Sequence, residues 1–260
     1  MAQKTSGVIA AGHQKTAEAG QEILALGGNA FDAAIAAVLA SFVVESTLTS
    51  TPGGGFFLAH TQDNQNILFD FFSQTPRYKK PLQEINFYPI NINFGTAVQA
   101  FHIGLGSIAI PGNIAGVFEV HKSLGRLPFE VIAEPAINYA QNGFKISQFQ
   151  DLCIKLLQPI LLALPESKKI YAPKGEVLTA GKIAYMKDFA ATLTELAKKG
   201  AREFYQGDIG HQLVRDCQEK GGYLTLEDLI SYQFIARKPL NINYRGYELL
   251  TNPPPGYGGA

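Results

Sequence analysis

The sequence has few cysteines, no excess of charge and no metal-ligand pattern. Its 260 residues carry 22 basic and 22 acidic side chains, and this balance argues against nucleic acid as a partner, because phosphate binding needs a basic face. Cys153 and Cys217 are far apart and lack a CxxC partner, so we expect free thiols rather than a disulfide or a metal site. The five histidines show no ligand spacing, and we expect neither a metal nor another cofactor.

Signals for export and for membranes are also missing. The opening residues, MAQKTSGVIAAG, contain no apolar segment of the signal-peptide type, so we expect a cytoplasmic protein. The Ala-rich segment between Asp32 and Glu45 is too short for a membrane span, and no membrane contact is expected. With 46% hydrophobic residues the chain could form one large domain or two small ones. No linker or repeat divides it, which favours a single domain over residues 1–260.

The segment GGNAFD, residues 27–32, is the most informative local pattern. Asn29 is a good helix N-cap, and Asp32 stands where a capping box needs its carboxylate. Gly27 follows an expected helix over residues 17–26, at the position of a left-handed C-cap. The helix after Asp32 is apolar around its whole circumference, which predicts that it is buried. The pattern therefore indicates a packing device.

The rest of the chain is predicted to contain both helices and strands. GVIAAG at 7–12 is interpreted as a short buried strand, with Thr16 as the cap of the first helix. The capping box Thr225–Asp228 predicts a late helix. The other predicted elements are strand pairs at 56–61 with 66–72 and at 240–244 with 247–251, and helices at 113–124, 129–142, 148–163, 186–199 and 202–220.

Two glycine-rich stretches invite a nucleotide-binding interpretation. GLGSIA at 104–109 matches G-x-G-x-x-A, but a dinucleotide site needs a helix directly after the glycines, and Pro111-Gly112 would break it. The triple glycine at 53–55 is not followed by Lys-Ser/Thr, so it is no P-loop. We therefore do not favour a nucleotide site.

Several motifs in this order resemble the γ-glutamyltransferase family. Any one of them is a weak signal, but together they span most of the chain. They are GGNAFDAA at 27–34, GSIAIPGNIAG at 106–116, EFYQGDIG at 203–210, GGYLTLEDLISY at 221–232, PLNINYRG at 239–246 and the Pro-Pro-Pro run at 253–255.

The resemblance implies an N-terminal-nucleophile hydrolase with an α+β fold, arranged as an αββα sandwich. Members of the family are precursors that cleave themselves, and the new N-terminal threonine of the small subunit is nucleophile and, through its amine, general base. The implied substrates are γ-glutamyl compounds such as glutathione, and the implied partner is the small subunit of the same precursor. Residues 1–260 would be the large-subunit part only, an incomplete sandwich.

The implied nucleophile lies downstream of the Pro-Pro-Pro run. No threonine here matches it, and Thr51 and Thr75 are poor stand-ins because a proline follows each. We therefore expect no catalytic residue in this chain and no activity from it alone. An inactive fragment or a binding module remains an alternative.

A further departure concerns substrate recognition. The family has an Asp-Phe-Arg segment whose arginine pairs with the α-carboxylate of the γ-glutamyl group, and here Phe72 stands in that place. Either Arg77, the nearest arginine in sequence, supplies the charge, or the donor lacks that carboxylate, as in a family acylase with another acyl group. The plain alternative is that Phe72 is a core residue.

Overall fold

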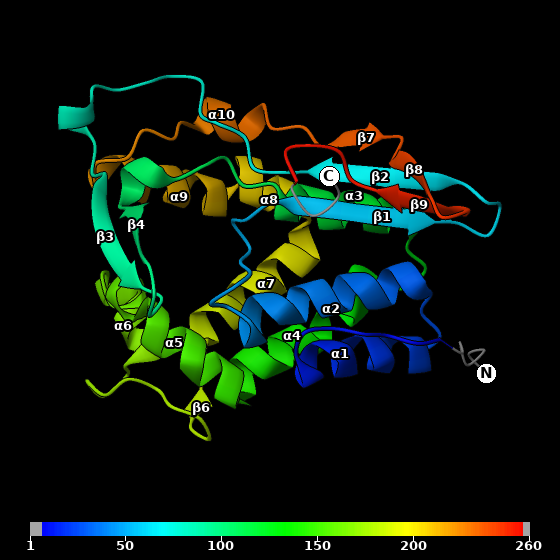
Figure 1. Ribbon diagram of the computed structural model, residues 1–260, viewed down its shortest axis with the longest axis horizontal. Helices are drawn as coiled ribbons and strands as arrows, with labels where there is room; N and C mark the ends of the chain where they lie inside the picture. The colour runs from blue at the N-terminus through cyan, green and yellow to red at the C-terminus, as the bar shows by residue number, and fades with distance from the viewer. Residues whose placement is uncertain (1–6, 257–260) are drawn as a thin grey trace.

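The computed structural model describes residues 7–256, in which a small sheet lies beside a layer of helices (Figure 1). The helices are α1 Gln14–Ala25, α2 Ala30–Val44, α3 Asn113–Leu124, α4 Phe129–Asn142, α5 Gln148–Leu161, α6 Pro165–Tyr171, α7 Lys187–Lys199, α8 Ala201–Gln206, α9 Asp208–Glu219 and α10 Leu226–Ile230, with the 3-10 turns η1 Leu82–Glu84 and η2 Leu105–Ser107. The strands are β1 Gly55–His60, β2 Asn66–Phe71, β3 Tyr88–Asn93, β4 Val98–Ile103, β5 Phe144–Lys145, β6 Ile183–Ala184, β7 Ile235–Arg237, β8 Leu240–Tyr244 and β9 Tyr247–Thr251. The expected mixture of helix and sheet is confirmed.

The largest sheet has the antiparallel order β1-β2-β7. Its hairpin pairs Gly55 with Phe71, as the apolar strands on either side of QDNQ predicted. β7 comes from the far end of the chain and pairs with the last residues of β2, placing Ile235 opposite Asp70. One face of β1 packs on α2, where the Phe57 ring centroid is 6.4 Å from that of Phe31. The end of β2 is therefore paired with β1 on one edge and with β7 on the other.

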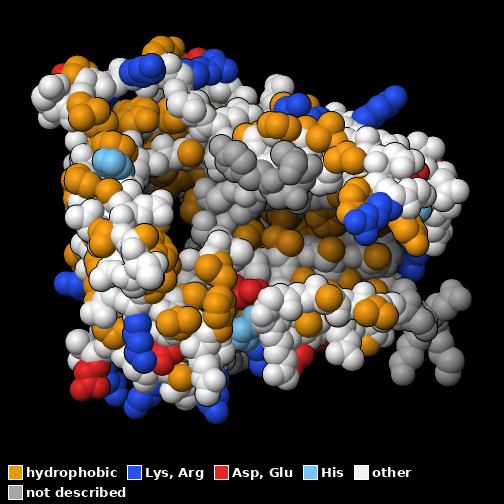
Figure 2. All heavy atoms as spheres, in the orientation of Figure 1, with side chains coloured by type: hydrophobic (Ala, Val, Ile, Leu, Met, Phe, Trp, Pro, Cys, Tyr) orange, Lys and Arg blue, Asp and Glu red, His pale blue; other side chains and the backbone are white. Residues whose placement is uncertain are grey.

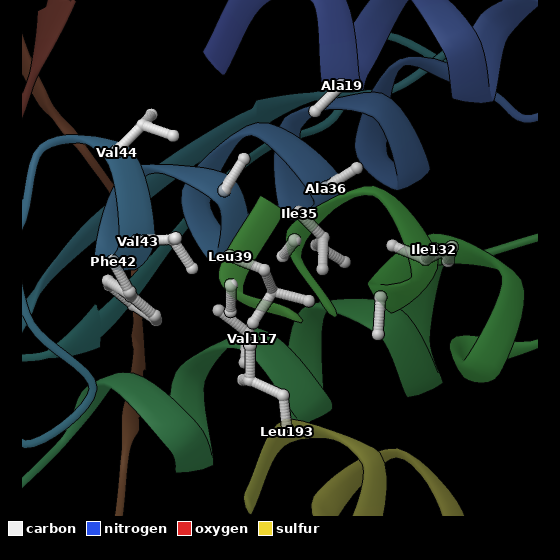
Figure 3. Close-up of a cluster of buried hydrophobic side chains, with 14 of the residues drawn as sticks. Ala19, Ile35, Ala36, Leu39, Phe42, Val43, Val44, Val117, Ile132 and Leu193 are labelled. Atoms are coloured by element: carbon white, nitrogen blue, oxygen red, sulfur yellow. The ribbon is translucent and has the colours of Figure 1, made fainter. Parts of the chain in front are cut away.

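Helix α2 is the centre of the main hydrophobic core. Ile35, Ala36 and Val43 have no exposed surface. Figure 3 shows side chains of α1, α3, α4 and α7 converging on this helix. The prediction that an all-apolar helix is buried is confirmed, since most residues of α2 are buried. A second cluster joins α3 to α8–α10 and contains Ile110, Ile114, Leu196, Phe204, Tyr205, Val214, Cys217, Leu224, Leu229 and Tyr232.

Capping residues fix where several helices begin. Asn29 accepts from the backbone N–H of Asp32 at 2.9 Å, and the Asp32 carboxylate accepts from the Asn29 N–H at 2.9 Å, which is the predicted capping box. The predicted box of α10 is also present, with Thr225 and Asp228 as its members. Gly27 has a φ of 94°, in the left-handed region predicted for it.

The structure corrects three local predictions. Residues 7–12 form no strand, and Val8 is 99% exposed, because no neighbouring strand pairs with this stretch. His13, not Thr16, caps α1, and the Thr16 hydroxyl instead donates to Glu45 Oε2 at 2.6 Å. The single helix expected over 202–220 is two helices, α8 and α9, divided at Gly207. Within residues 7–256, no helix is both long and apolar enough to cross a bilayer.

Candidate functional site

Three of the six family-like motifs, those at 106–116, 203–210 and 221–232, contribute residues to one end of the β1–β2 hairpin. The carbonyl of Gly53 accepts from the backbone N–H groups of Gly112 and Asn113, at 2.8 and 3.0 Å. A Cβ on Gly54 would lie 2.3 Å from the Ser73 nitrogen, and one on Gly112 would lie 1.9 Å from the Phe71 carbonyl oxygen. Only glycine permits this approach, so the glycine run packs three chain segments together.

Two tyrosine hydroxyls form hydrogen bonds with the backbone of this junction. The hydroxyl of Tyr232 donates to the Phe72 carbonyl at 3.0 Å, and that of Tyr205 donates to the Pro111 carbonyl at 2.8 Å. Their rings stack with centroids 5.7 Å apart. Burial raises the pKa of both phenols well above the ordinary value, so both stay protonated and remain donors. The backbone at Phe72 is therefore held in one place.

Asp70 secures the same turn from the sheet side. Its Oδ1 accepts from the Phe72 N–H at 3.1 Å, while its Oδ2 is 2.8 Å from Nε of Arg237 on β7. Only 6% of the Asp70 side chain is exposed, so the arginine compensates a nearly buried charge. This ion pair joins β7 to the end of β2.

Phe72 itself projects from this fixed backbone. Its side chain is 38% exposed, and its ring centroid is 5.6 Å from that of Phe56 on β1. The alternative that Phe72 is a core residue is therefore wrong. It lies just beyond the last paired residue of β2, where the sheet no longer covers it.

Arg77 is paired with α10. Its backbone N–H donates to Asp228 Oδ1 at 2.9 Å, and its guanidinium Nη1 is 3.2 Å from Glu227 Oε1. Burial alone would raise the pKa of Asp228, but the N–H groups of Arg77 and Thr225 and the Thr225 hydroxyl outweigh burial and lower it. Asp228 thus fixes the loop that carries Arg77, and the arginine side chain remains half exposed beside a carboxylate.

The motif GGNAFD is structural. Asp32 is fully buried and accepts from the Arg126 N–H at 2.9 Å, in addition to its capping bond. The Asn29 amide donates to the Leu124 carbonyl at 2.7 Å. Together these bonds tie the start of α2 to the α3–α4 turn.

The nucleotide-binding interpretation of residues 104–109 has no structural support. Gly104 is followed by the turn η2 and not by a helix, since α3 begins only at Asn113. Among residues 7–256, no three His, Cys, Asp or Glu side chains group as metal ligands would. Thr51 is buried and Thr75 is exposed.

Sequence reasoning missed Tyr232, Tyr205 and the Asp70–Arg237 pair. Both tyrosines and Asp70 were part of stretches already compared with the family, and Arg237 lies between two of them, but nothing local indicated their partners. The Tyr232–Phe72 bond spans 160 positions, and the Tyr205–Pro111 bond spans 94.

Comparison with known proteins supplies the family. Residues 16–260 match the model of the Gamma-glutamyltranspeptidase family. Glutathione hydrolase 3 of Arabidopsis thaliana is 31% identical, across 97% of this chain and 38% of the relative. The CapD capsule biosynthesis proenzyme of Bacillus anthracis is 31% identical across 96% of this chain and 42% of the relative, and an Acylase ACY 1 proenzyme of Pseudomonas is 30% identical across 98% and 46%.

The fold agrees with this match. The crystal structure of Helicobacter pylori gamma-glutamyltranspeptidase superposes with a TM-score of 0.87 at 32% identity, covering 100% of this chain and 73% of that one. The enzyme of Pseudomonas nitroreducens gives 0.83 at 28% identity, covering 97% and 72%. Against the curated relatives named above, the chain spans only 38% to 46% of their length. It belongs to the gamma-glutamyltranspeptidase family.

Proposed function

We propose that this chain is the large-subunit part of a threonine-dependent enzyme that transfers or hydrolyses the acyl group of γ-glutamyl-type amides. The observation that carries the proposal is the junction of Gly53–Gly55, the end of β2 and Pro111–Asn113, at which three of the family-like motifs come together. Family membership supports the reaction class.

The chemistry would follow that of N-terminal nucleophiles. The threonine oxygen attacks the amide carbonyl carbon, its proton passes to the threonine amine, and the leaving amine takes that proton as the C–N bond breaks. Water or an acceptor amine then cleaves the resulting ester and restores the hydroxyl. In this proposal the chain contributes no catalytic residue to these reaction steps. Its part is to form one wall of the substrate site.

The second subunit would come from the same precursor. Several relatives are proenzymes, and they are about twice as long as this chain. In this proposal residues 1–260 are one domain, and strands of the partner complete the αββα sandwich against the β1-β2-β7 sheet. Taken alone, the chain would then be inactive.

A second candidate is an acylase with a different acyl donor. The residues at the expected carboxylate-binding position favour it. Phe72 stands where a carboxylate-binding arginine is expected, and Arg77 already pairs with Glu227. An Acylase ACY 1 proenzyme is among the relatives. Both candidates share the same acyl-transfer chemistry and differ in the acyl group.

The test is self-cleavage of the complete gene product followed by release of a chromophore from acyl anilides. Cleavage and turnover would support the enzyme, and neither residues 1–260 alone nor a variant lacking the nucleophile should turn over. A complete product that neither cleaves itself nor releases chromophore would indicate an inactive protein or a binding module instead.

Arg77→Ala distinguishes the two donors. Because the backbone of Arg77 is held by Asp228 and its side chain lies toward Glu227 on α10, we expect the KM for a γ-glutamyl anilide to change less than about twofold. The free energy of unfolding should change by about 0–1 kcal/mol, as for an exposed pair. A rise in KM of about tenfold, without loss of stability, would show that Arg77 binds the substrate carboxylate.

A further inference from the structure

We propose that Phe56 and Phe72 form an aromatic surface that receives an uncharged, apolar acyl group, such as an arylacetyl group. The proposal rests on the acyl-transfer function proposed above and names the donor class for that site. The structural feature that carries it is a pair of adjacent rings with centroids 5.6 Å apart, Phe56 on β1 and the partly exposed Phe72 just beyond β2.

The turn is organised before any ligand binds. The Phe72 N–H is held by Asp70, and the Phe72 carbonyl is held by Tyr232. Behind them, Gly112 leaves no room for the Phe71 carbonyl to move inward. Because this backbone is fixed at both its donor and its acceptor, little backbone freedom is lost when a ligand binds beside it.

The C-terminal segment closes one side of this surface. A Cβ on Gly256 would lie 2.8 Å from Cε2 of Phe56, so the backbone of the segment lies against that ring. The Asn252 amide donates to the Gly256 carbonyl at 3.2 Å and holds the segment in its loop. Figure 1 shows this segment curving over the end of the hairpin at which β1 begins. Phe56 therefore forms the closed side of the surface, and Phe72 the open side.

The two arginines considered for a carboxylate are both placed against acidic side chains. Arg237 is bound to Asp70, whose side chain is almost fully buried, and Arg77 is turned toward α10, where it forms a solvent-exposed pair with Glu227. Taking Arg237 from Asp70 would leave that carboxylate uncompensated. A donor with a charged acyl end would thus lose hydration against two phenyl rings without gaining an ion pair, whereas an aryl group gains contact with both.

Figure 2 is consistent with an apolar approach to this region. On the face shown, hydrophobic side chains gather in the hollow between the β1–β2 hairpin and α2.

The decisive experiment compares two anilides on the complete gene product. We expect kcat/KM for phenylacetyl p-nitroanilide to exceed that for γ-glutamyl p-nitroanilide by roughly tenfold or more. Phe72→Ala should raise the phenylacetyl KM by roughly tenfold with little change in kcat, and Phe72→Arg should reverse the preference. Phe149→Ala removes a 60% exposed ring on α5 and should alter neither substrate.

Direct binding separates recognition from catalysis. Phenylacetamide, titrated by NMR, should bind the wild-type protein and Phe149→Ala but lose roughly tenfold in affinity to Phe72→Ala. Turnover that prefers the γ-glutamyl anilide and is unaffected at Phe72 would overturn this inference and leave the acyl-transfer function standing. Binding that depends on Phe72, with no turnover of either anilide, would support the aromatic site and refute the acyl-transfer function. If the protein neither binds phenylacetamide through Phe72 nor turns over either anilide, the aromatic site and the acyl-transfer function are both refuted.

Discussion

Replacing Asp32 should destabilise the protein more than replacing any exposed carboxylate at a helix start. Asp32 is fully buried, and its two oxygens accept from the N–H groups of Asn29 and Arg126, each at 2.9 Å, and of Leu127 at 3.4 Å. Asp32→Ala leaves these donors without a partner. Hydrogen bonds to a charged group contribute about 1.5–3 kcal/mol each, so losing the two short ones should cost roughly 3–6 kcal/mol in the free energy of unfolding.

The matched control is Asp188→Asn. Asp188 is also in the first turn of a helix, α7, but it is exposed. It contributes mainly its charge near the helix dipole, worth about 0.3–1 kcal/mol. Asp32→Asn should fall between the two, since the amide keeps one acceptor oxygen and turns the other into a donor.

The assay is thermal and urea unfolding followed by far-UV circular dichroism, since the chain has no tryptophan. A loss of about 3 kcal/mol should lower the Tm by roughly 6–12 °C for a chain of this size. If Asp32→Ala lay within about 1 kcal/mol of Asp188→Asn, the reasoning that this carboxylate ties α2 to the α3–α4 turn would be refuted.

Two further predictions concern the candidate site. The pKa of Asp228 is lowered in the folded protein, so its contribution to stability is present above its unfolded pKa and is lost as the pH falls through the folded pKa. The stability advantage of the wild type over Asp228→Asn should therefore shrink below about pH 4. An advantage that stays constant from pH 7 to pH 3 would contradict the assignment. Tyr232→Phe removes the 3.0 Å bond to the Phe72 carbonyl and should cost about 0.5–1.5 kcal/mol in urea unfolding. Tyr139→Phe, on a half-buried tyrosine of α4, is its control, and equal effects would argue against the bond.

Local patterns were sufficient for the elements whose causes are local. The capping boxes of α2 and α10, the left-handed Gly27 and the β1–β2 hairpin all depend on residues a few positions apart, and each was predicted. The burial of α2 was also predictable, because an all-apolar helix has no side that water can cover favourably. The family resemblance could be stated from motif order alone.

Local sequence patterns were insufficient to predict structure where a residue's contact partner is distant in the sequence. Residues 7–12 are apolar enough for a strand, but a strand exists only if another strand pairs with it, and none does. Phe72 could be core or surface from its sequence, and the end of β2 decided its exposure.

The sequence by itself determined the helix caps, the hairpin, the buried helix and the order of the family motifs, because these follow from neighbours along the chain. Only the tertiary structure decided that Arg77 pairs with Glu227, 150 positions away, that Arg237 pairs with Asp70, and that Tyr232 holds Phe72. Charge, hydroxyl and ring are visible in the sequence, but which of them meet depends on how the sheet and helices pack. The charge available to a substrate is therefore a property of the fold.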